Sequence, residues 1–470
     1  MIRFLYPVKI IDYRNVKNAD SLFCKKQLQI GLNDKDVAGF SPRATIVLDF
    51  GKEIRGGIRI LTSDTDDAKC ARVRIRFGES LSECYAEIGE KNATNDHSPR
   101  DINVDLSSWS DLSFGETGFR FVKIDLLNEI NCNIKAIVAK SYELRKKPVY
   151  TYCGGDALVK NIFTVAKRTI DLCSVGDYVY DGIKRDRLVW VGDIYPEMLA
   201  LTTLYGKFAA LERSLDFAKN QYPLPQMMYG MPTYSLWWIM VVCDYYERTD
   251  AKEFVLRQLD YMNGLLKTFD TKVNENGKLD LSCYFVDWPT VGKKDEYVGA
   301  VLITVAAYKK GVALLKKFGF DTESFEETLS RLYKNDLSVY EQKQVIGLKY
   351  FAEGEISDDE YALLVKDGAS GFSTFMSYFI LKAIASRDAN LAVELMKEYY
   401  GAMLNIGATT FFEDFDLKWL ENSSVLDELP KNGQKDIHGD YGAHCYTGFR
   451  HSLCHGWSSG VITFIKEFLG

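Results

Sequence analysis

The densest group of ionisable residues in the sequence lies between Asp181 and Asp193, in the run Asp-Gly-Ile-Lys-Arg-Asp-Arg-Leu-Val-Trp-Val-Gly-Asp. It combines three aspartates and three cationic residues with one tryptophan. Carboxylates beside Lys, Arg and an aromatic wall can hold several hydroxyl groups of a ligand and shift the pKa of a catalytic carboxyl. The alternative is a solvated loop, whose surface ion pairs would contribute little. Because Trp190 and Gly192 interleave with the charges, we favour a functional site.

A second candidate carboxylate is Glu413, in the aromatic run Thr-Thr-Phe-Phe-Glu-Asp-Phe. Glutamate is rarely buried without a partner. An acid flanked by Phe411, Phe412 and Phe415 therefore either caps the start of a helix or carries out chemistry, and the residues alone leave both interpretations open.

The third segment, His451-Ser-Leu-Cys-His-Gly-Trp-Ser-Ser-Gly460, holds two of the five histidines of the chain. A single histidine is more often structural than catalytic, because its ring also serves as a buried hydrogen-bonding group. The ten cysteines include no CxxC pair and fit no zinc spacing, and no EF-hand-like loop is present. We therefore expect no metal and no cofactor.

Two of these segments resemble motifs of the bacterial α-L-rhamnosidases, glycoside hydrolase family 78. In that family an Asp is followed by a run rich in Arg and Asp/Glu that ends Leu-Gly-Trp-Thr-Gly-Asp, and the segment from Asp181 to Asp193 is similar. Glu413 stands where the family has the Glu of Thr-Thr-x-Trp-Glu.

The remaining similarities follow in family order along the chain. Ser452-Leu-Cys-His455 resembles the Ser-x-x-His motif before the final helix. Weaker echoes occur at Ser235-Leu-Trp-Trp238 and at Phe285-Val-Asp-Trp288. The chain is thus identified as similar to a compact α-L-rhamnosidase.

This resemblance implies an enzyme that hydrolyses a terminal α-L-rhamnoside, or a similar deoxy sugar, with inversion. Inversion needs a general acid and a general base about 6.5–9.5 Å apart, which leaves room for the attacking water. Asp186 carries over as the acid and Glu413 as the base. The residues that would hold the sugar are Asp181, Arg185, Trp190, Asp193, Trp238, Asp287, Trp288, His455 and Trp457.

The chain departs from the family at the acid, where Asp186 is one methylene shorter than the Glu of many members. Val189 and Phe412 also replace the usual Gly and Trp. Asp186 lies among cations, which favour its ionised form, so we expect burial or a neighbouring carboxylate to keep it protonated at rest. Glu413 must stay ionised, and we expect His455 to hold it.

Two other functions remain open. Arg185 and Arg187 would suit a substrate carboxylate, so the same barrel could act on uronic-acid sugars as a hydrolase or a lyase. A non-catalytic sugar-binding or sensor protein could also retain the pocket. Both candidate carboxylates persist within motifs, which favours an enzyme.

The elements that position these residues fall into two parts, which differ in the period of their apolar residues. As far as Lys147 the apolar residues alternate at period two, as in 44–51, 71–78 and 119–126, which predicts a β-sandwich over residues 1–147. From Asp156 the period becomes helical, with at least ten helical stretches, among them 195–219 and 298–317. Paired helices that close into an (α/α)6 barrel over residues 148–470 fit this count and the family fold.

Composition limits the partners and the compartment. With a formal net charge of -7 and no dense Lys/Arg block, the chain is not expected to bind nucleic acid. No window of ~18 apolar residues predicts a membrane span, and the N-terminal stretch lacks the apolar core of a secretory signal. Unpatterned cysteines are typical of reduced cytoplasmic proteins. We expect a cytoplasmic protein that binds a small oligosaccharide or glycoside, with the oligomeric state, a homo-oligomer included, left open.

Overall fold

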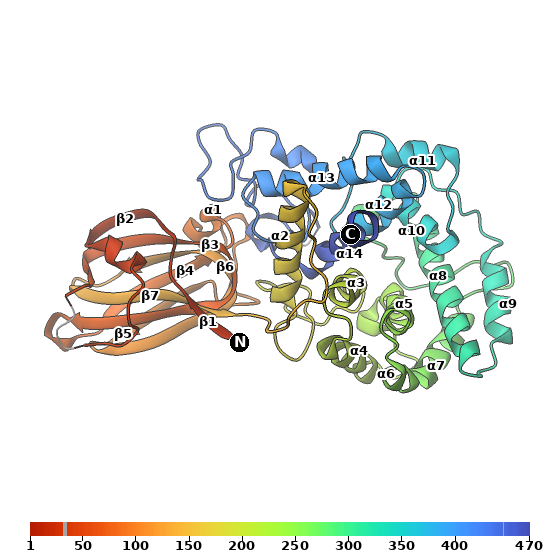
Figure 1. The fold of residues 1–470 in the computed structure, drawn as a ribbon, viewed down its shortest axis with the longest axis horizontal. Coiled ribbons are helices and arrows are strands. Elements are labelled where there is room, and N and C mark those ends of the chain that lie inside the picture. The colour runs from red at the N-terminus through yellow and green to blue at the C-terminus, as the bar shows by residue number, and fades with distance from the viewer. Residues whose placement is uncertain (32–34, 445) are drawn as a thin grey trace.

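The computed structural model describes residues 1–31, 35–444 and 446–470 (Figure 1). Its N-terminal part, here called the β-region, is one antiparallel sheet in the strand order β1-β7-β3-β6-β4-β5, with β2 paired to β3. The strands predicted from the period-two alternation are therefore confirmed, and they pair antiparallel. The strands are β1 (Ile2–Leu5), β2 (Lys9–Lys17), β3 (Ala38–Thr65), β4 (Ala71–Gly78), β5 (Asp101–Leu106), β6 (Ser110–Leu126) and β7 (Cys132–Tyr142).

The long strands β3 and β6 fold this sheet around a single core. The first part of β3 pairs with β2 and its second part with β7, and register shifts separate the parts after Asp49 and after Gly56. Gly56 is required there, because an added Cβ would lie 1.9 Å from the carbonyl oxygen of Lys140. Buried residues of both parts, such as Leu48 and Ile60, belong to one apolar cluster.

The helical region begins at α2 (Ala157–Cys173), where the Asp156 side chain accepts hydrogen bonds from the backbone N–H groups of Leu158 and Val159. The segment between β7 and α2 contains the predicted boundary at 147/148, which stays a prediction. The remaining helices are α3 (Ile194–Tyr205), α4 (Ala209–Gln221), α5 (Pro232–Thr249), α6 (Lys252–Leu256), α7 (Leu259–Asp270), α8 (Glu296–Lys317), α9 (Glu323–Leu332), α10 (Lys343–Glu353), α11 (Asp358–Val365), α12 (Ser377–Ala385), α13 (Ala389–Asn405) and α14 (Val461–Leu469).

Six of these helices contact one another in sequence, in the order α3, α5, α8, α10, α12, α14 and back to α3. They are strongly apolar, and α3 is buried along its whole length. Helices such as α7 and α9 bury one face only, as their apolar residues recur every three or four positions. Within the described part of the chain, α8 alone is long and apolar enough to cross a membrane, and 78% of that stretch is buried inside the protein, as in the core helix of many globular proteins.

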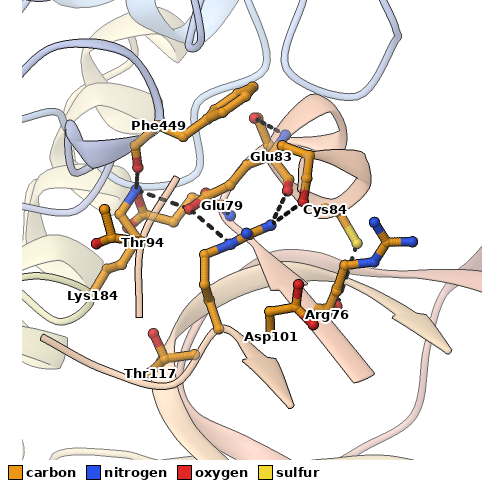
Figure 2. Close-up of polar contacts among 12 residues, drawn as sticks. Arg76, Glu79, Glu83, Cys84, Thr94, Asp101, Thr117, Lys184 and Phe449 are labelled. Carbon is orange, nitrogen blue, oxygen red and sulfur yellow. Dashed lines mark hydrogen bonds and ion pairs between the residues drawn. The ribbon is translucent and has the colours of Figure 1, made fainter. Parts of the chain in front are cut away.

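Short helix α1 (Leu81–Tyr85) lies at the boundary between the β-region and the helical region. Beside it, Lys184 of the helical region is buried between two carboxyls of the β-region, with its Nζ 2.9 Å from Glu79 Oε2 and 3.3 Å from Glu83 Oε1 (Figure 2). The same ammonium group donates to the backbone carbonyls of Phe449 and His451. This lysine therefore joins the β-region to two segments that the sequence assigned to the site.

Candidate active site

The segment from Asp181 to Asp193 is a loop that leads into α3. The Asp181 side chain closes the loop by accepting the backbone N–H of Leu188 at 2.8 Å. The backbone carbonyl of Asp181 accepts the N–H of Gly456 at 2.7 Å, which places the loop beside the His455 segment. Burial, together with the charges of Asp193 and Asp186, raises the pKa of Asp181 well above its usual range.

Glu413 lies in a connecting segment after α13, and its side chain has no exposed surface. Its Oε1 accepts from Arg185 Nη2, and its Oε2 accepts from the Ser452 backbone N–H at 3.2 Å. Its backbone carbonyl accepts from Thr374 Oγ1 and from Trp457 Nε1. Burial raises the pKa of Glu413 to about 7, although Arg185 lowers it. The carboxyl is therefore about half ionised at neutral pH.

Asp186 meets Glu413 at a single guanidinium group. Arg185 Nη1 donates to Asp186 Oδ2 at 2.9 Å while its Nη2 donates to Glu413. The Tyr446 ring lies over the same guanidinium, 3.9 Å from its carbon. The two carboxyls predicted to be catalytic, Asp186 and Glu413, are thus brought together at Arg185, which is 228 positions from Glu413 in the sequence.

His455 does not hold Glu413 as expected. Its Nε2 is 3.5 Å from Glu413 Oε1 and 3.8 Å from Asp193 Oδ2, both beyond a good hydrogen bond. Burial, with the charge of Arg185, keeps the pKa of His455 well below its usual range, so the ring is neutral. The charge of Glu413 is instead balanced by Arg185 and by the Ser452 N–H, a correction to the sequence-based expectation.

Asp193 and Trp190 are linked through a tyrosine. Tyr234 donates to Asp193 Oδ1 at 2.9 Å and packs edge-on against Trp190, with ring centroids 6.0 Å apart. Burial raises the pKa of Asp193 well above its usual range, and the Glu413 charge adds to the shift. Burial thus favours the protonated form of Asp193, which can donate as well as accept a hydrogen bond.

Asp287 and Trp288 lie on a neighbouring loop. Asp287 accepts from Ser373 Oγ and from the Trp288 N–H, and burial raises its pKa to about 7. Trp288 packs edge-on against Tyr446 at 5.4 Å, and Tyr446 contacts Arg185. The Tyr446 ring therefore lies between Trp288 and the Arg185 guanidinium that joins the two carboxyls.

Of the other two tryptophans predicted to bind the sugar, Trp457 lies at the site and Trp238 does not. Trp457 donates to the Glu413 carbonyl and packs on His455, with ring centroids 4.2 Å apart. Trp238 has no exposed surface; its Nε1 donates to the Leu215 carbonyl of α4, and its ring packs on Tyr261 of α7. A side chain enclosed between outer helices offers no wall to a sugar, so the assignment of Trp238 is corrected to the core.

Several contacts at the site were not visible in the sequence. His97 of the β-region lies 3.1 Å from Asp186, and Ser452, Thr374 and Tyr234 position Glu413 and Asp193. Ser452 is the serine of the Ser-x-x-His motif that ends at His455, so the sequence itself points to Ser452 as a site residue. His97 is one of only five histidines, but nothing at its position in the sequence points to Asp186.

One cluster of buried ligand atoms lies at the same boundary. Carboxylate oxygens of Glu79 and Glu83 and a ring nitrogen of His438 lie within 4.8 Å of one another. The Lys184 ammonium is already close to both carboxylates, as Figure 2 shows for Glu79 and Glu83. The positive charge that two buried carboxylates require is thus supplied by the chain itself.

Comparisons with known proteins bear on the family and the fold of the chain. Residues 151–353 match the model of the bacterial alpha-L-rhamnosidase 6 hairpin glycosidase domain. This segment is a six-hairpin glycosidase domain of the bacterial α-L-rhamnosidase type. The family resemblance predicted from the motifs is confirmed, and the matched family consists of glycoside hydrolases. A search of curated proteins finds no match.

Solved α-L-rhamnosidases share the fold. The rhamnosidase from Klebsiella oxytoca with rhamnose bound has a TM-score of 0.74 at 17% identity, and the match covers 100% of this chain and 96% of that one. The family 78 rhamnosidase of Bacillus sp. GL1 has a TM-score of 0.73 at 17% identity, covering 96% of this chain and 48% of that one. The α-L-rhamnosidase from Dictyoglumus thermophilum has a TM-score of 0.69 at 13% identity, covering 99% and 51%. The chain thus spans nearly all of the first protein and about half of the other two.

Proposed function

We propose that the protein is an inverting glycoside hydrolase that removes a terminal α-L-rhamnose, or a similar deoxy sugar, from a small oligosaccharide or glycoside. The observation that carries the proposal is the meeting of Asp186 and Glu413 on the Arg185 guanidinium, in a chain whose residues 151–353, which include Asp186 but not Glu413, match an α-L-rhamnosidase domain. A pair of carboxyls flanking one small space is what glycoside hydrolysis requires.

In the proposed reaction Asp186 donates its proton to the leaving oxygen as the glycosidic bond to that oxygen breaks. Glu413 removes a proton from a water molecule that attacks the anomeric carbon from the opposite face, and the new bond inverts the configuration. Buried acids beside the pair, above all Asp193, would bind sugar hydroxyls. We expect ~6.5–9.5 Å between the two carboxyls when substrate is bound.

We also propose that the six mutually contacting helices are the inner ring of an (α/α)6 barrel and that the folded sheet packs as a β-sandwich. The cyclic order of the helix contacts and the apolar inner helices support the first proposal. The single core shared by both parts of β3 supports the second.

The rival substrate, a uronic-acid sugar, gains little support. Arg185 is engaged by Asp186 and Glu413, and Arg187 donates to the backbone carbonyls of Glu116 and His97. Both arginines considered for a substrate carboxylate are therefore engaged within the protein.

We propose a cytoplasmic location, which the free thiols favour: the nine cysteines in the described residues form no disulfide. Assembly into a homo-oligomer remains a proposal, to be tested by the mass of the protein in solution.

The test is hydrolysis of a panel of nitrophenyl glycosides that includes α-L-rhamnoside and β-D-glucuronide, followed by NMR of the sugar released from the active substrate. We expect rhamnose to be released first as the β anomer. Cleavage of the glucuronide alone would replace the proposal with the uronic-acid rival, and binding of rhamnose without cleavage of any glycoside would indicate a sensor protein.

A further inference from the structure

The turn that carries Asp186 is strained. Asp186 and Arg187 are consecutive non-glycine residues with a φ of 52° each. Residues other than glycine adopt this left-handed conformation rarely, because their Cβ approaches the following carbonyl oxygen, and then usually singly. Two strained residues in succession persist only where surrounding contacts hold them, and such positions concentrate at functional sites.

Contacts from the β-region hold this turn. Ser98 Oγ donates to the carbonyl of Lys184 at 2.8 Å, just before the turn. Within the turn, the Arg187 side chain donates to the carbonyls of Glu116 and His97 at 3.2 and 3.4 Å. The neighbouring region thus holds the turn both at a strained residue and just before it.

His97 contacts the acid itself. Its Nδ1 accepts the Asp186 backbone N–H at 3.2 Å and lies 3.1 Å from Asp186 Oδ1. The other ring nitrogen, Nε2, is 2.8 Å from Arg450 Nη2 and 3.4 Å from Asp96 Oδ2, so the far side of the ring is held as well. The ring therefore lies against both the backbone and the carboxyl of Asp186, while Arg185 donates to Oδ2.

We propose that His97, a residue of the β-region, is a positioning residue for the general acid Asp186; this rests on the proposed glycoside hydrolysis. As Asp186 gives its proton to the leaving oxygen, the electron pair of the broken glycosidic bond moves to that oxygen and Asp186 becomes a carboxylate. By accepting the Asp186 backbone N–H, the His97 ring holds the strained turn in the one conformation that directs the Asp186 carboxyl at the leaving oxygen. The β-region therefore completes the acid half of the site.

Two substitutions of similar size separate the two ring nitrogens. In His97→Asn the amide oxygen takes the place of Nδ1 and can still accept the Asp186 backbone N–H. In His97→Gln the amide reaches the Nε2 position, where its oxygen can accept from Arg450, and no acceptor remains at the Nδ1 position. Each variant is assayed on a rhamnosyl disaccharide, whose leaving alkoxide needs a proton, and on dinitrophenyl α-L-rhamnoside, whose phenolate leaves without one.

We expect His97→Gln to lower kcat/KM on the disaccharide about 10-fold or more, a fraction of the ~100-fold or larger effect of removing an acid, and to leave the dinitrophenyl substrate within about 3-fold. His97→Asn should keep most of both activities. The matched control is Ser98→Ala, which removes a hydrogen bond to the neighbouring Lys184 and should affect the two substrates equally.

Equal losses on both substrates in His97→Gln, or no loss on either, would overturn the role of His97 while leaving the hydrolase assignment intact. A loss in His97→Asn as large as that in His97→Gln would also overturn it, because the acceptor at the Nδ1 position would then not be what matters. If the wild-type protein cleaves neither glycoside, the proposed function fails, and the role of His97 fails with it.

Discussion

The two halves of the candidate site are held in opposite ways. Glu413 lies within the helical region with no exposed side-chain surface, and burial raises its pKa to about 7. The Asp186 side chain is 14% exposed, lies on a strained turn at the boundary between the regions, and is contacted by His97 of the β-region. The protonation state of the base is thus set by desolvation, whereas the acid depends on contacts that fix its position. Changes on the base side should alter pH dependence, and changes on the acid side should alter leaving-group dependence.

The largest effect is expected at Lys184, which ties the two regions together. Lys184→Met leaves Glu79 and Glu83 without their buried countercharge, and breaking such a pair costs about 3–5 kcal/mol in the free energy of unfolding. The loss should be greater at pH 8 than at pH 5, because a buried carboxyl with a raised pKa is costliest where the unfolded chain would ionise it.

The matched control is Lys316→Met, which breaks the exposed pair with Glu326. Denaturant unfolding should show little or no change in stability for this variant, because solvent screens the exposed pair. Equal losses at the two lysines would mean that the buried network is not what joins the regions.

Glu413→Gln should lower kcat by at least ~100-fold on every substrate, activated or not, because attack of water requires the base whichever group leaves. Steady-state kinetics on the disaccharide and on the dinitrophenyl rhamnoside measures this effect. Full activity in a folded Glu413→Gln protein would show that the base lies elsewhere, and Glu197, a fully buried carboxyl on α3, becomes the next residue to test.

Asp186→Asn should lower kcat/KM on the disaccharide by at least ~100-fold but have a much smaller effect on the dinitrophenyl substrate, since only the first needs a proton donor. The ratio of the two losses is the quantity to measure. A ratio near one would remove the contrast between the two sides of the site and with it the assignment of the acid.

Arg185 shapes the pH dependence of the base. Activity of the wild-type protein should rise with pH through about 7, as Glu413 ionises. The guanidinium lowers the pKa of Glu413, so Arg185→Gln should move this limb of the kcat/KM profile to higher pH by about one unit, the lower end of the effect of a nearby charge. A limb that stays in place would show that another group controls it.

The smallest effect is expected at Trp238. Trp238→Phe removes one buried hydrogen bond to Leu215 and should cost about 1 kcal/mol of stability, with KM for the rhamnoside unchanged. Thermal unfolding and steady-state kinetics test the two parts. A raised KM would return Trp238 to the sugar site.

The local pattern of the sequence was enough to identify strands and helices but not how they continue or break. The predicted run 44–51 is only part of a longer strand, β3, because Gly56 allows the chain to bend without leaving the sheet. Conversely, the helix expected over 195–219 is two helices, α3 and α4, since Gly206 takes a φ of 65° between them.

The same limit applies to the site. Motifs located Asp186 and Glu413, because each motif keeps its chemistry within a few residues. His97 could not be found in this way, as its contact with Asp186 spans 89 positions and depends on how the two regions pack. The assignment of Trp238 to the sugar site is wrong because a weak motif similarity identifies the residue but not which side of α5 faces the site.

The bridging guanidinium also bears on the response of the protein to dissolved salt. At physiological ionic strength, dissolved ions screen exposed charges over about 8–10 Å, but they screen buried ion pairs much less. The side chain of Arg185 is 6% exposed, and the Glu413 carboxyl that it contacts has no exposed surface. The catalytic charges therefore carry their counterion within the fold, and turnover should depend little on ionic strength.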